Sequence, residues 1–214
     1  MKISLLCSDP KHPVVPYLMN WGQAQKGVHE VELVTSKRQL SGGDVLFLIS
    51  CSELIGSSEK AKYEASLVLH ASDLPTGRGW SPHVWELLYG AKTITLSLIE
   101  AAEPVDSGRV WKKTKINIPK DALWDEINHA LFMAEIELID YAIQNFGLIE
   151  PVPQDEKSQP VTRYRKRTPE DSRLDVNKTI AEQFDLIRVC DPQRYPAFFD
   201  HLGHRYLLKI EKIS

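Results

Sequence analysis

Short aliphatic runs alternate with amphipathic segments along the first two thirds of the chain, a pattern typical of α/β proteins. The runs at residues 3–7, 31–35, 44–50 and 66–70 are mainly apolar and end at turn residues, as buried strands of parallel sheets do. Residues 14–25 follow Pro13 and have the apolar spacing of a helix that packs on these strands. The pattern therefore predicts an α/β fold built on a mainly parallel sheet.

The pattern of apolar positions changes after residue 80. Ser81 followed by Pro82 predicts the start of a helix, which Gly90 should end. Residues 93–99 alternate with period two, which predicts a strand with one solvated face, and residues 110–118 are its predicted neighbour. Apolar residues then recur at helical spacing from 121 to 146, so a long helix should close the sheet domain.

The composition changes again at residues 151–158, which are rich in Pro, Gln, Asp, Glu and Lys and predict a linker. A basic cluster follows at 163–167, then an amphipathic helix at 178–189 and a β-hairpin whose strands, 195–199 and 205–213, flank Gly203. The predicted organisation is a catalytic domain at 1–150 and, at 151–214, a linker, a small helix and a C-terminal β-hairpin appendage.

Length, charge and cysteine content limit the possible functions. The chain of 214 residues, 43% hydrophobic, can form one sizeable core plus a small appendage, and its net charge of -3 disfavours a nucleic-acid partner. The three cysteines are far apart and lack metal-ligand spacing, so no metal site is predicted. The apolar run at the start is too short for a signal peptide, and no segment could span a membrane. We expect a soluble, cytoplasmic protein with no membrane partner.

Two side chains are candidates for acid/base chemistry. His70 ends an apolar run just before a glycine-rich loop, and Asp106 lies in a turn after the strand at 93–99. Since both loops follow strands of one predicted sheet, both side chains can line the same cleft. An imidazole beside a carboxylate forms an acid/base pair. The alternatives are a structural histidine and an aspartate that only caps its turn.

The residues around both side chains resemble a known family. Residues 70–79, HASDLPTGRG, are similar to the signature of formyltransferases that use 10-formyltetrahydrofolate, and residues 105–108, VDSG, resemble the second motif of that family. The resemblance implies a Rossmann-like catalytic domain over about residues 1–147, with His70 and Asp106 as catalytic residues. It also implies that 10-formyltetrahydrofolate is the formyl donor.

One position departs from the family pattern. The family has a catalytic asparagine two residues before the histidine, where this chain has Val68. Valine cannot donate a hydrogen bond to an oxyanion. Ser66 lies on the same strand face by period two and is therefore a third catalytic candidate, with backbone groups and His70 as alternatives. The same departure keeps open a folate-binding protein without turnover.

The resemblance also implies where the pterin ring of the donor binds. Backbone groups in the loop after the third strand and in the acidic turn would hold the ring, which suits a flat heterocycle rich in donors and acceptors. The matching positions in this sequence are Glu53, Ile55, Ala102, Glu103 and Val105.

Three formyl acceptors are compatible with this family. A methionyl-tRNA acceptor is disfavoured, because the chain is acidic and has only a short tail after residue 150. A phosphoribosylglycinamide acceptor is the alternative, although the first loop, residues 8–12, lacks the glycine- and serine-rich sequence that holds a ribose phosphate. The chain is most similar to N-formyltransferases of nucleotide-linked amino sugars for surface polysaccharides, through residues 70–82, 166–172 and 195–199.

This resemblance leads to predictions about the acceptor and the assembly. The residues expected to bind the nucleotide-linked amino sugar are Arg78, Trp80, Lys166 and Arg167. The basic cluster at 163–167 could neutralise the nucleotide phosphates, or it could be an ordinary solvated charge run. The aromatic residues of the C-terminal hairpin offer more apolar surface than a small tail can bury, which predicts a homodimer.

Overall fold

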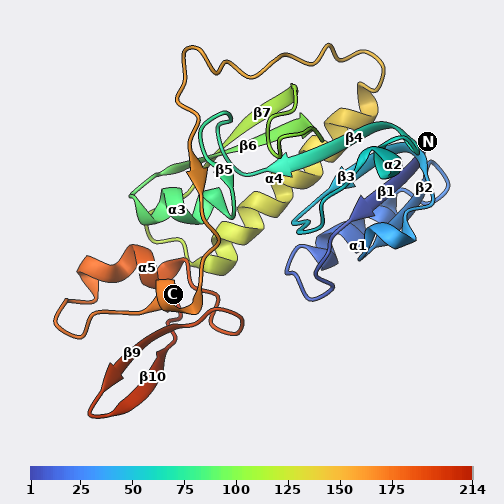
Figure 1. The fold of residues 1–214 in the computed structure, drawn as a ribbon. Helices are drawn as coiled ribbons and strands as arrows, with labels where there is room; N and C mark the ends of the chain where they lie inside the picture. The colour runs from blue at the N-terminus through green and yellow to red at the C-terminus, as the bar shows by residue number, and fades with distance from the viewer. Residues whose placement is uncertain (214) are drawn as a thin grey trace.

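A six-stranded sheet forms the centre of the molecule in the computed structural model, which describes residues 1–213 (Figure 1). The strand order is β2-β1-β3-β4-β6-β7, with the first four strands parallel, β6 antiparallel to β4 and β7 antiparallel to β6. This confirms the predicted α/β fold with a mainly parallel sheet. The strands are β1 (Lys2–Leu6), β2 (Glu30–Val34), β3 (Gly43–Leu48), β4 (Tyr63–His70), β6 (Thr93–Glu100) and β7 (Val110–Asn117).

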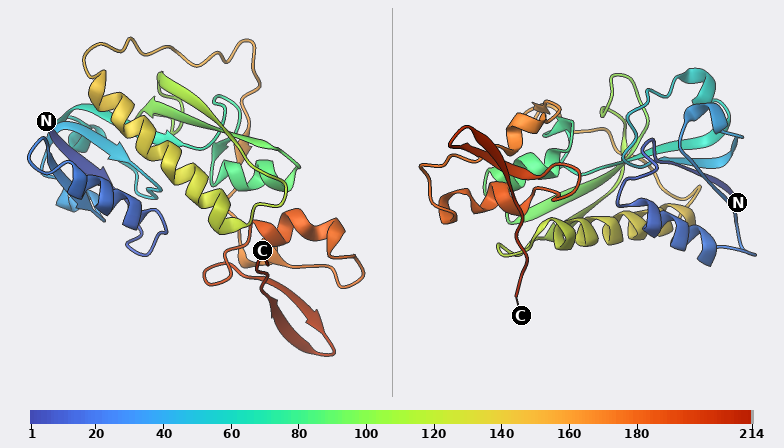
Figure 2. Two further views of the ribbon diagram at one scale, coloured as in Figure 1. Left: turned by 180° about the vertical axis from the view of Figure 1, so that it is seen from behind. Right: turned by 90° about the horizontal axis from the view of Figure 1, so that it is seen from below.

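Two helices, α1 (Val15–Ala24) and α4 (Trp124–Gln144), lie side by side on one face of the sheet (Figure 2). The indole Nε1 of Trp21 donates to Asp140 Oδ1 at 2.8 Å and joins them. The main core lies between these helices and the strands. On the other face, a smaller apolar cluster lies beneath the 3₁₀-helix η1 (Lys37–Gln39), the short helix α2 (Ser57–Lys60) and the loop after β3.

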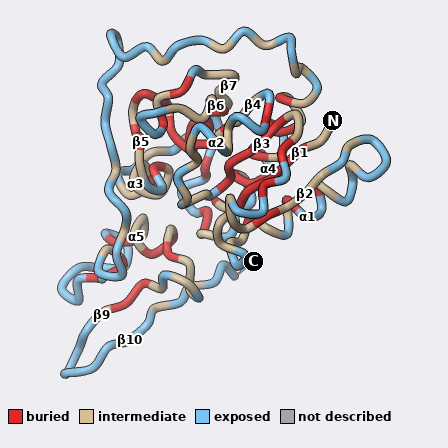
Figure 3. The backbone as a smooth tube through the Cα atoms, turned by 45° about the vertical axis from the view of Figure 1, so that its right-hand side comes forward, coloured by how far each residue is buried: buried red, intermediate tan, exposed pale blue. Residues whose placement is uncertain are grey.

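The chain after α4 runs past the β7 edge of the sheet before it reaches the C-terminal elements (Figure 1). Residues 151–165, called the strap below, end in β8 (Arg163–Tyr164), which pairs in parallel with β5 (Arg78–Gly79). The remaining elements are α3 (Pro82–Leu88), η2 (Pro169–Ser172), η3 (Ala181–Gln183), α5 (Phe184–Arg188), β9 (Ala197–His201) and β10 (His204–Leu208). The last two form the predicted hairpin, which projects from the body and is largely exposed (Figures 2 and 3).

Three predictions about these elements need correction. Strand β6 has no solvated face, because Ser97 is fully buried and its hydroxyl donates to the Ser72 carbonyl at 2.7 Å, in the loop that covers this side. The helix predicted at 178–189 is shorter, since the Gln183 side chain bonds to the backbone of residues 175, 178 and 179 and holds them in a loop. The segment predicted as a linker at 151–158 also contacts the sheet domain, because Val152 pairs with Val110 and the side chains of Gln154 and Glu156 bond to Arg78.

No helix within residues 1–213 combines the length and the apolar character needed to cross a membrane.

One carboxylate lies buried in the main core. Glu135, on the sheet-facing side of α4, is 4% exposed, and its Oε2 has no hydrogen-bond partner among residues 1–213. Burial disfavours the charged form and raises the pKa of Glu135 from 4.5 to about 8. At neutral pH this side chain is therefore mainly a neutral carboxylic acid.

The raised pKa of Glu135 predicts a pH-dependent stability. The folded state holds this proton more tightly than the unfolded state, so the stability is full below pH about 4.5 and is lost as pH rises towards about 8. Glu135→Gln keeps the shape but cannot ionise. Between pH 5 and 8.5, the Tm of Glu135→Gln should rise relative to the Tm of the wild type. The Tm of Glu137→Gln, a change at an exposed neighbour, should not. Parallel pH profiles for all three proteins would contradict the assignment.

Candidate active site

His70 ends β4 and is 7% exposed. Its Nε2 lies 2.9 Å from the carbonyl oxygen of Gly77, which can only accept a hydrogen bond. Nε2 must therefore carry a proton, which leaves Nδ1 as the nitrogen that can gain or lose one. The glycine-rich loop thus fixes both the orientation and the tautomer of the imidazole.

Asp106 faces this Nδ1. Its Oδ1 lies 3.6 Å from His70 Nδ1, and its Oδ2 accepts a hydrogen bond from the Gly79 backbone N–H at 2.9 Å. Both side chains are buried, and the facing atoms are further apart than a hydrogen bond. The geometry is therefore that of an imidazole and a carboxylate whose facing atoms are both open to a third group.

The pair does not form for the reason that the sequence suggested. Because β6 is antiparallel to β4, it ends beside Leu67 and not beside His70. The turn that follows must fold back to bring Asp106 to the end of β4, and Asp106 takes φ of +66° to do so. Gly108 permits this path, since a Cβ there would lie 1.8 Å from the Glu100 carbonyl oxygen.

Ser66 does not join the pair. It lies four residues before His70 on an extended strand, which places it about 13 Å away along the chain. Its Oγ is buried and has no partner within the described residues. Val68 lies between them and, like Ile55 and Ala101, packs against the apolar cluster on this face. The structure therefore brings His70 and Asp106 together and leaves Ser66 apart.

The five positions matched to pterin binding lie in two loops that meet at this apolar cluster. Ile55 comes from the loop after β3, and Ala102, Glu103 and Val105 come from the loop after β6, next to Ala101. Within the described residues, the backbone groups of Ile55, Ala102, Glu103 and Val105 form no hydrogen bonds. Unpaired backbone donors and acceptors beside an apolar floor suit a flat polar heterocycle. The Glu53 carboxylate instead accepts from the Lys37 N–H at 2.8 Å.

The predicted acceptor-binding residues have different roles in the structure. Arg78 is buried, and its guanidinium is hydrogen-bonded to Gln154 and Glu156 of the strap. Trp80 is 42% exposed and carries the Lys166 ammonium 4.6 Å from its ring centroid. Of these three residues, Trp80 and Lys166 are accessible to a ligand from solvent.

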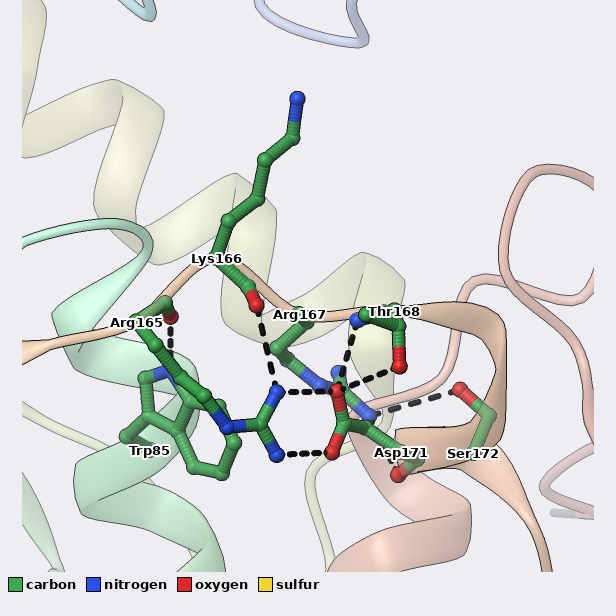
Figure 4. Close-up of polar contacts among 7 residues, drawn as sticks. All are labelled: Trp85, Arg165, Lys166, Arg167, Thr168, Asp171 and Ser172. Carbon is green, nitrogen blue, oxygen red and sulfur yellow. Dashed lines mark hydrogen bonds and ion pairs between the residues drawn. The ribbon is translucent and has the colours of Figure 1, made fainter.

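The basic cluster at 163–167 is largely used within the protein (Figure 4). The Arg165 guanidinium binds both carboxylate oxygens of Asp171 and lies 4.8 Å from the Trp85 ring. The Arg167 guanidinium donates to the Asp171 carbonyl at 2.9 Å. Lys166 points away from these residues and makes no ion pair with the described part of the chain.

Sequence reasoning missed two histidines with shifted pKa values. Burial lowers the pKa of both His12 and His83 to about 4, so both are neutral at physiological pH. The positive charge that His70 can carry also lowers the pKa of His83. His83 lies on α3, directly after the glycine-rich loop, but no pattern in the sequence indicated which way it points. Within residues 1–213, no group of side chains has the arrangement of a metal site.

Comparison with known proteins gives the fold a name. No protein-family model matches the chain. The methionyl-tRNA formyltransferase of Protochlamydia amoebophila (strain UWE25) is 28% identical over 151 residues, which are 69% of this chain and 47% of that protein. This chain thus spans about half the length of the curated relative it matches. The methionyl-tRNA formyltransferase of Clostridium thermocellum superimposes with a TM-score of 0.81 at 20% identity, over 96% of this chain and 90% of that one. The chain has the formyltransferase fold.

Two further structures with this fold are similar. HypX from Aquifex aeolicus, solved in complex with tetrahydrofolic acid, has a TM-score of 0.80 at 22% identity. The match covers 97% of this chain and 37% of the HypX chain. A sugar N-formyltransferase from Shewanella sp FDAARGOS_354 has a TM-score of 0.72 at 11% identity, over 100% of this chain and 99% of that one. The resemblance drawn from the two motifs is thereby confirmed at the level of the fold.

The close approach of Gly79 to the strap predicts a specific sensitivity. Gly79 has φ of +98°, and a Cβ there would lie 2.3 Å from the Tyr164 carbonyl oxygen, whereas Gly90 has φ of +85° and nothing nearby. Gly90→Ala should cost about 1–2 kcal/mol from backbone strain alone. Gly79→Ala should cost about 1–3 kcal/mol more, because it overpacks the strap. Urea unfolding measures both, and equal losses would show that β5 and β8 are not in contact.

Proposed function

We propose that this protein transfers a formyl group from 10-formyltetrahydrofolate to the amine of a nucleotide-linked amino sugar. The observation that carries the proposal is the buried His70–Asp106 pair, held by two formyltransferase motifs beside loops with unpaired backbone groups. Similarity in fold to HypX with tetrahydrofolic acid supports the donor, and similarity to a sugar N-formyltransferase supports the acceptor class.

The residues present fit the donor. The unpaired backbone groups of Ile55, Ala102 and Val105 would bind the pterin ring, and the apolar cluster around Val68 would contact its face. When bound, 10-formyltetrahydrofolate would supply an activated formyl group. The specificity of such a site comes from backbone groups, so the side chains of these loops are free to differ from those of relatives.

The pair can manage the protons of a direct attack by an amine. The 3.6 Å between His70 Nδ1 and Asp106 Oδ1 is longer than a hydrogen bond, so neither atom is committed to the other. Protonated Nδ1 can donate to the formyl oxygen as negative charge develops there. Asp106 can accept the proton that the attacking amine must lose, and the same proton can be returned to N10 of the donor when its bond to the formyl carbon breaks and tetrahydrofolate leaves. Buried charges act more strongly on one another than exposed ones, so the pair is well placed for both tasks.

A covalent route through Cys51 is less compatible with the structure. Cys51 lies near the loop after β3, but burial raises the pKa of its thiol, and its Sγ donates to the Glu53 carbonyl at 3.5 Å. A nucleophilic thiol requires a lowered pKa and a neighbouring base. All three cysteines are free, which supports a reaction in a reducing compartment such as the cytoplasm.

Trp80 and Lys166 support a nucleotide-linked acceptor. An exposed indole with an unpaired ammonium beside it can contact a nucleotide through stacking and phosphate binding together. This is a smaller basic surface than RNA binding needs, which argues for a nucleotide sugar over methionyl-tRNA. The first loop supports the sugar over phosphoribosylglycinamide, because its Asp9 carboxylate pairs with Arg194 where a phosphate would need backbone donors.

Release of tetrahydrofolate tests the function. The protein is mixed with 10-formyltetrahydrofolate and, separately, with a panel of nucleotide-linked amino sugars, phosphoribosylglycinamide and methionyl-tRNA, and tetrahydrofolate is followed by absorbance. Turnover with an amino sugar alone supports the proposal. Turnover with another acceptor would show that the proposed acceptor class is wrong. Folate binding without turnover on any acceptor would show that the protein binds folate without catalysing transfer.

His70→Ala and Asp106→Asn should each lower kcat by about 10²–10⁴-fold, because each removes one acid/base group. Both variants should fold, which circular dichroism and thermal unfolding can check. His201→Ala and Asp125→Asn, on exposed positions of the hairpin and of α4, are the matched controls and should keep full activity. Normal turnover in a folded Asp106→Asn would exclude Asp106 as the proton acceptor.

The C-terminal hairpin supports a homodimer. Its residues Leu202, Tyr206 and Leu207 are exposed, although the adjoining face packs on a small cluster around Leu174 and Ile187. A second copy could cover this apolar surface. Light scattering at micromolar concentration should report twice the chain mass, and Leu207→Glu should halve it. A monomeric wild type would contradict the proposal.

A further inference from the structure

Gln154, in the strap, lies where residues 151–165 cross the two motif loops. Its side chain makes three hydrogen bonds: Nε2 donates to the Asp106 carbonyl at 2.8 Å and to the Gly108 carbonyl at 2.9 Å, and Oε1 accepts from the Arg78 guanidinium at 2.8 Å. One amide thus holds both motif loops at once. We propose that Gln154 is a positioning residue that sets the geometry of the His70–Asp106 pair, an inference that rests on the proposed function.

The bonds to the acidic turn hold a strained backbone. Asp106 has φ of +66°, a conformation that is unfavourable for a residue with a Cβ unless its surroundings stabilise it. Within the described residues, Gln154 is the hydrogen-bond partner of both the Asp106 and the Gly108 carbonyl groups. Without it these carbonyls would lose their partner and the turn could relax. Relaxation would rotate the Asp106 carboxylate away from Nδ1.

The bond to Arg78 holds the other loop. Arg78 is buried and lies between Gly77, whose carbonyl accepts from His70 Nε2, and Gly79, whose N–H donates to Asp106 Oδ2. Fixing the Arg78 side chain therefore fixes the two backbone groups that orient the pair. Glu156 also binds this guanidinium and adds the opposite charge.

Gln154 acts only through other residues. Its amide atoms are bonded to two carbonyl groups and one guanidinium, and no bond reaches the His70 ring or the Asp106 carboxylate. Its removal should therefore change how the pair works more than how substrates bind. This separates positioning from a purely structural role, which would change stability alone.

Two variants and one control test the inference. Gln154→Leu removes all three bonds, whereas Gln154→Glu keeps an acceptor for Arg78 and removes both donors to the turn. Gln159→Leu changes an exposed glutamine in the same strap and is the matched control. Two measurements are made on each protein: steady-state kinetics as a function of pH, and NMR titration of the His70 ring, labelled with ¹³C, without substrate.

Both Gln154 variants should lower kcat by about 10- to 100-fold, the loss that a misplacement of about 1 Å can cause, with KM for donor and acceptor changed less than about threefold. The midpoint of the His70 titration should differ from that of the wild type, because the Asp106 carboxylate would lie at a different distance from the imidazole. Gln159→Leu should match the wild type in both measurements.

Several results would overturn the inference. These are a Gln154→Leu protein with wild-type kcat and titration, a change in KM alone, or the loss of the fold in both variants. The NMR titration needs no formyl transfer, so it decides the role of Gln154 even if the wild type has no activity. In that case the proposed function fails separately.

Discussion

The hydrogen bond from the Gly79 N–H to Asp106 Oδ2 joins the two halves of the site, and the arrangement of the site depends on it. Gly79 lies at the end of the loop that orients His70, and Asp106 lies on a turn that has to fold back from an antiparallel strand. No sheet pairing links these two loops directly. The strap supplies the missing connection, because β8 pairs with β5 on one side and Gln154 bonds to the turn on the other. The candidate site is therefore assembled from three segments that are far apart in the sequence.

This assembly explains how two ionisable side chains, His70 and Asp106, are accommodated at buried positions. A buried carboxylate or imidazole is costly unless it is hydrogen-bonded, and each free lone pair adds to the cost. Here one oxygen of Asp106 and one nitrogen of His70 are satisfied by backbone groups of the same loop. The two atoms that remain face one another at 3.6 Å. The protein thus satisfies the atoms that only orient the pair and leaves open the two that do chemistry.

The sequence predicted the strands, the main helices and the hairpin well, because each has its own local period of apolar residues. It also identified His70 and Asp106, through short motifs that the turns require. It failed where the outcome depended on distant packing. Ser97 is buried because its hydroxyl bonds to the loop that covers it, and the predicted helix at 178–189 begins late because the Gln183 side chain bonds to the backbone before it. Local periodicity reveals neither contact. The contacts of the strap were missed for the same reason. Its polar composition is that of a linker, and its pairing with β5 is visible only in the folded structure.

Val68 affects which residues donate and accept protons in the proposed reaction. Because Val68 is apolar and packs against the cluster on this face, this part of β4 offers no side-chain donor to a formyl oxygen, and Ser66 is too far along the strand. His70 Nδ1 is then the side-chain donor within reach, and it cannot donate while it is also the base that receives the amine proton. The proton must go to Asp106. A reaction with this division requires a protonated imidazole and an ionised carboxylate at the start, and the bonds to Gly77 and Gly79 keep the two side chains oriented for it.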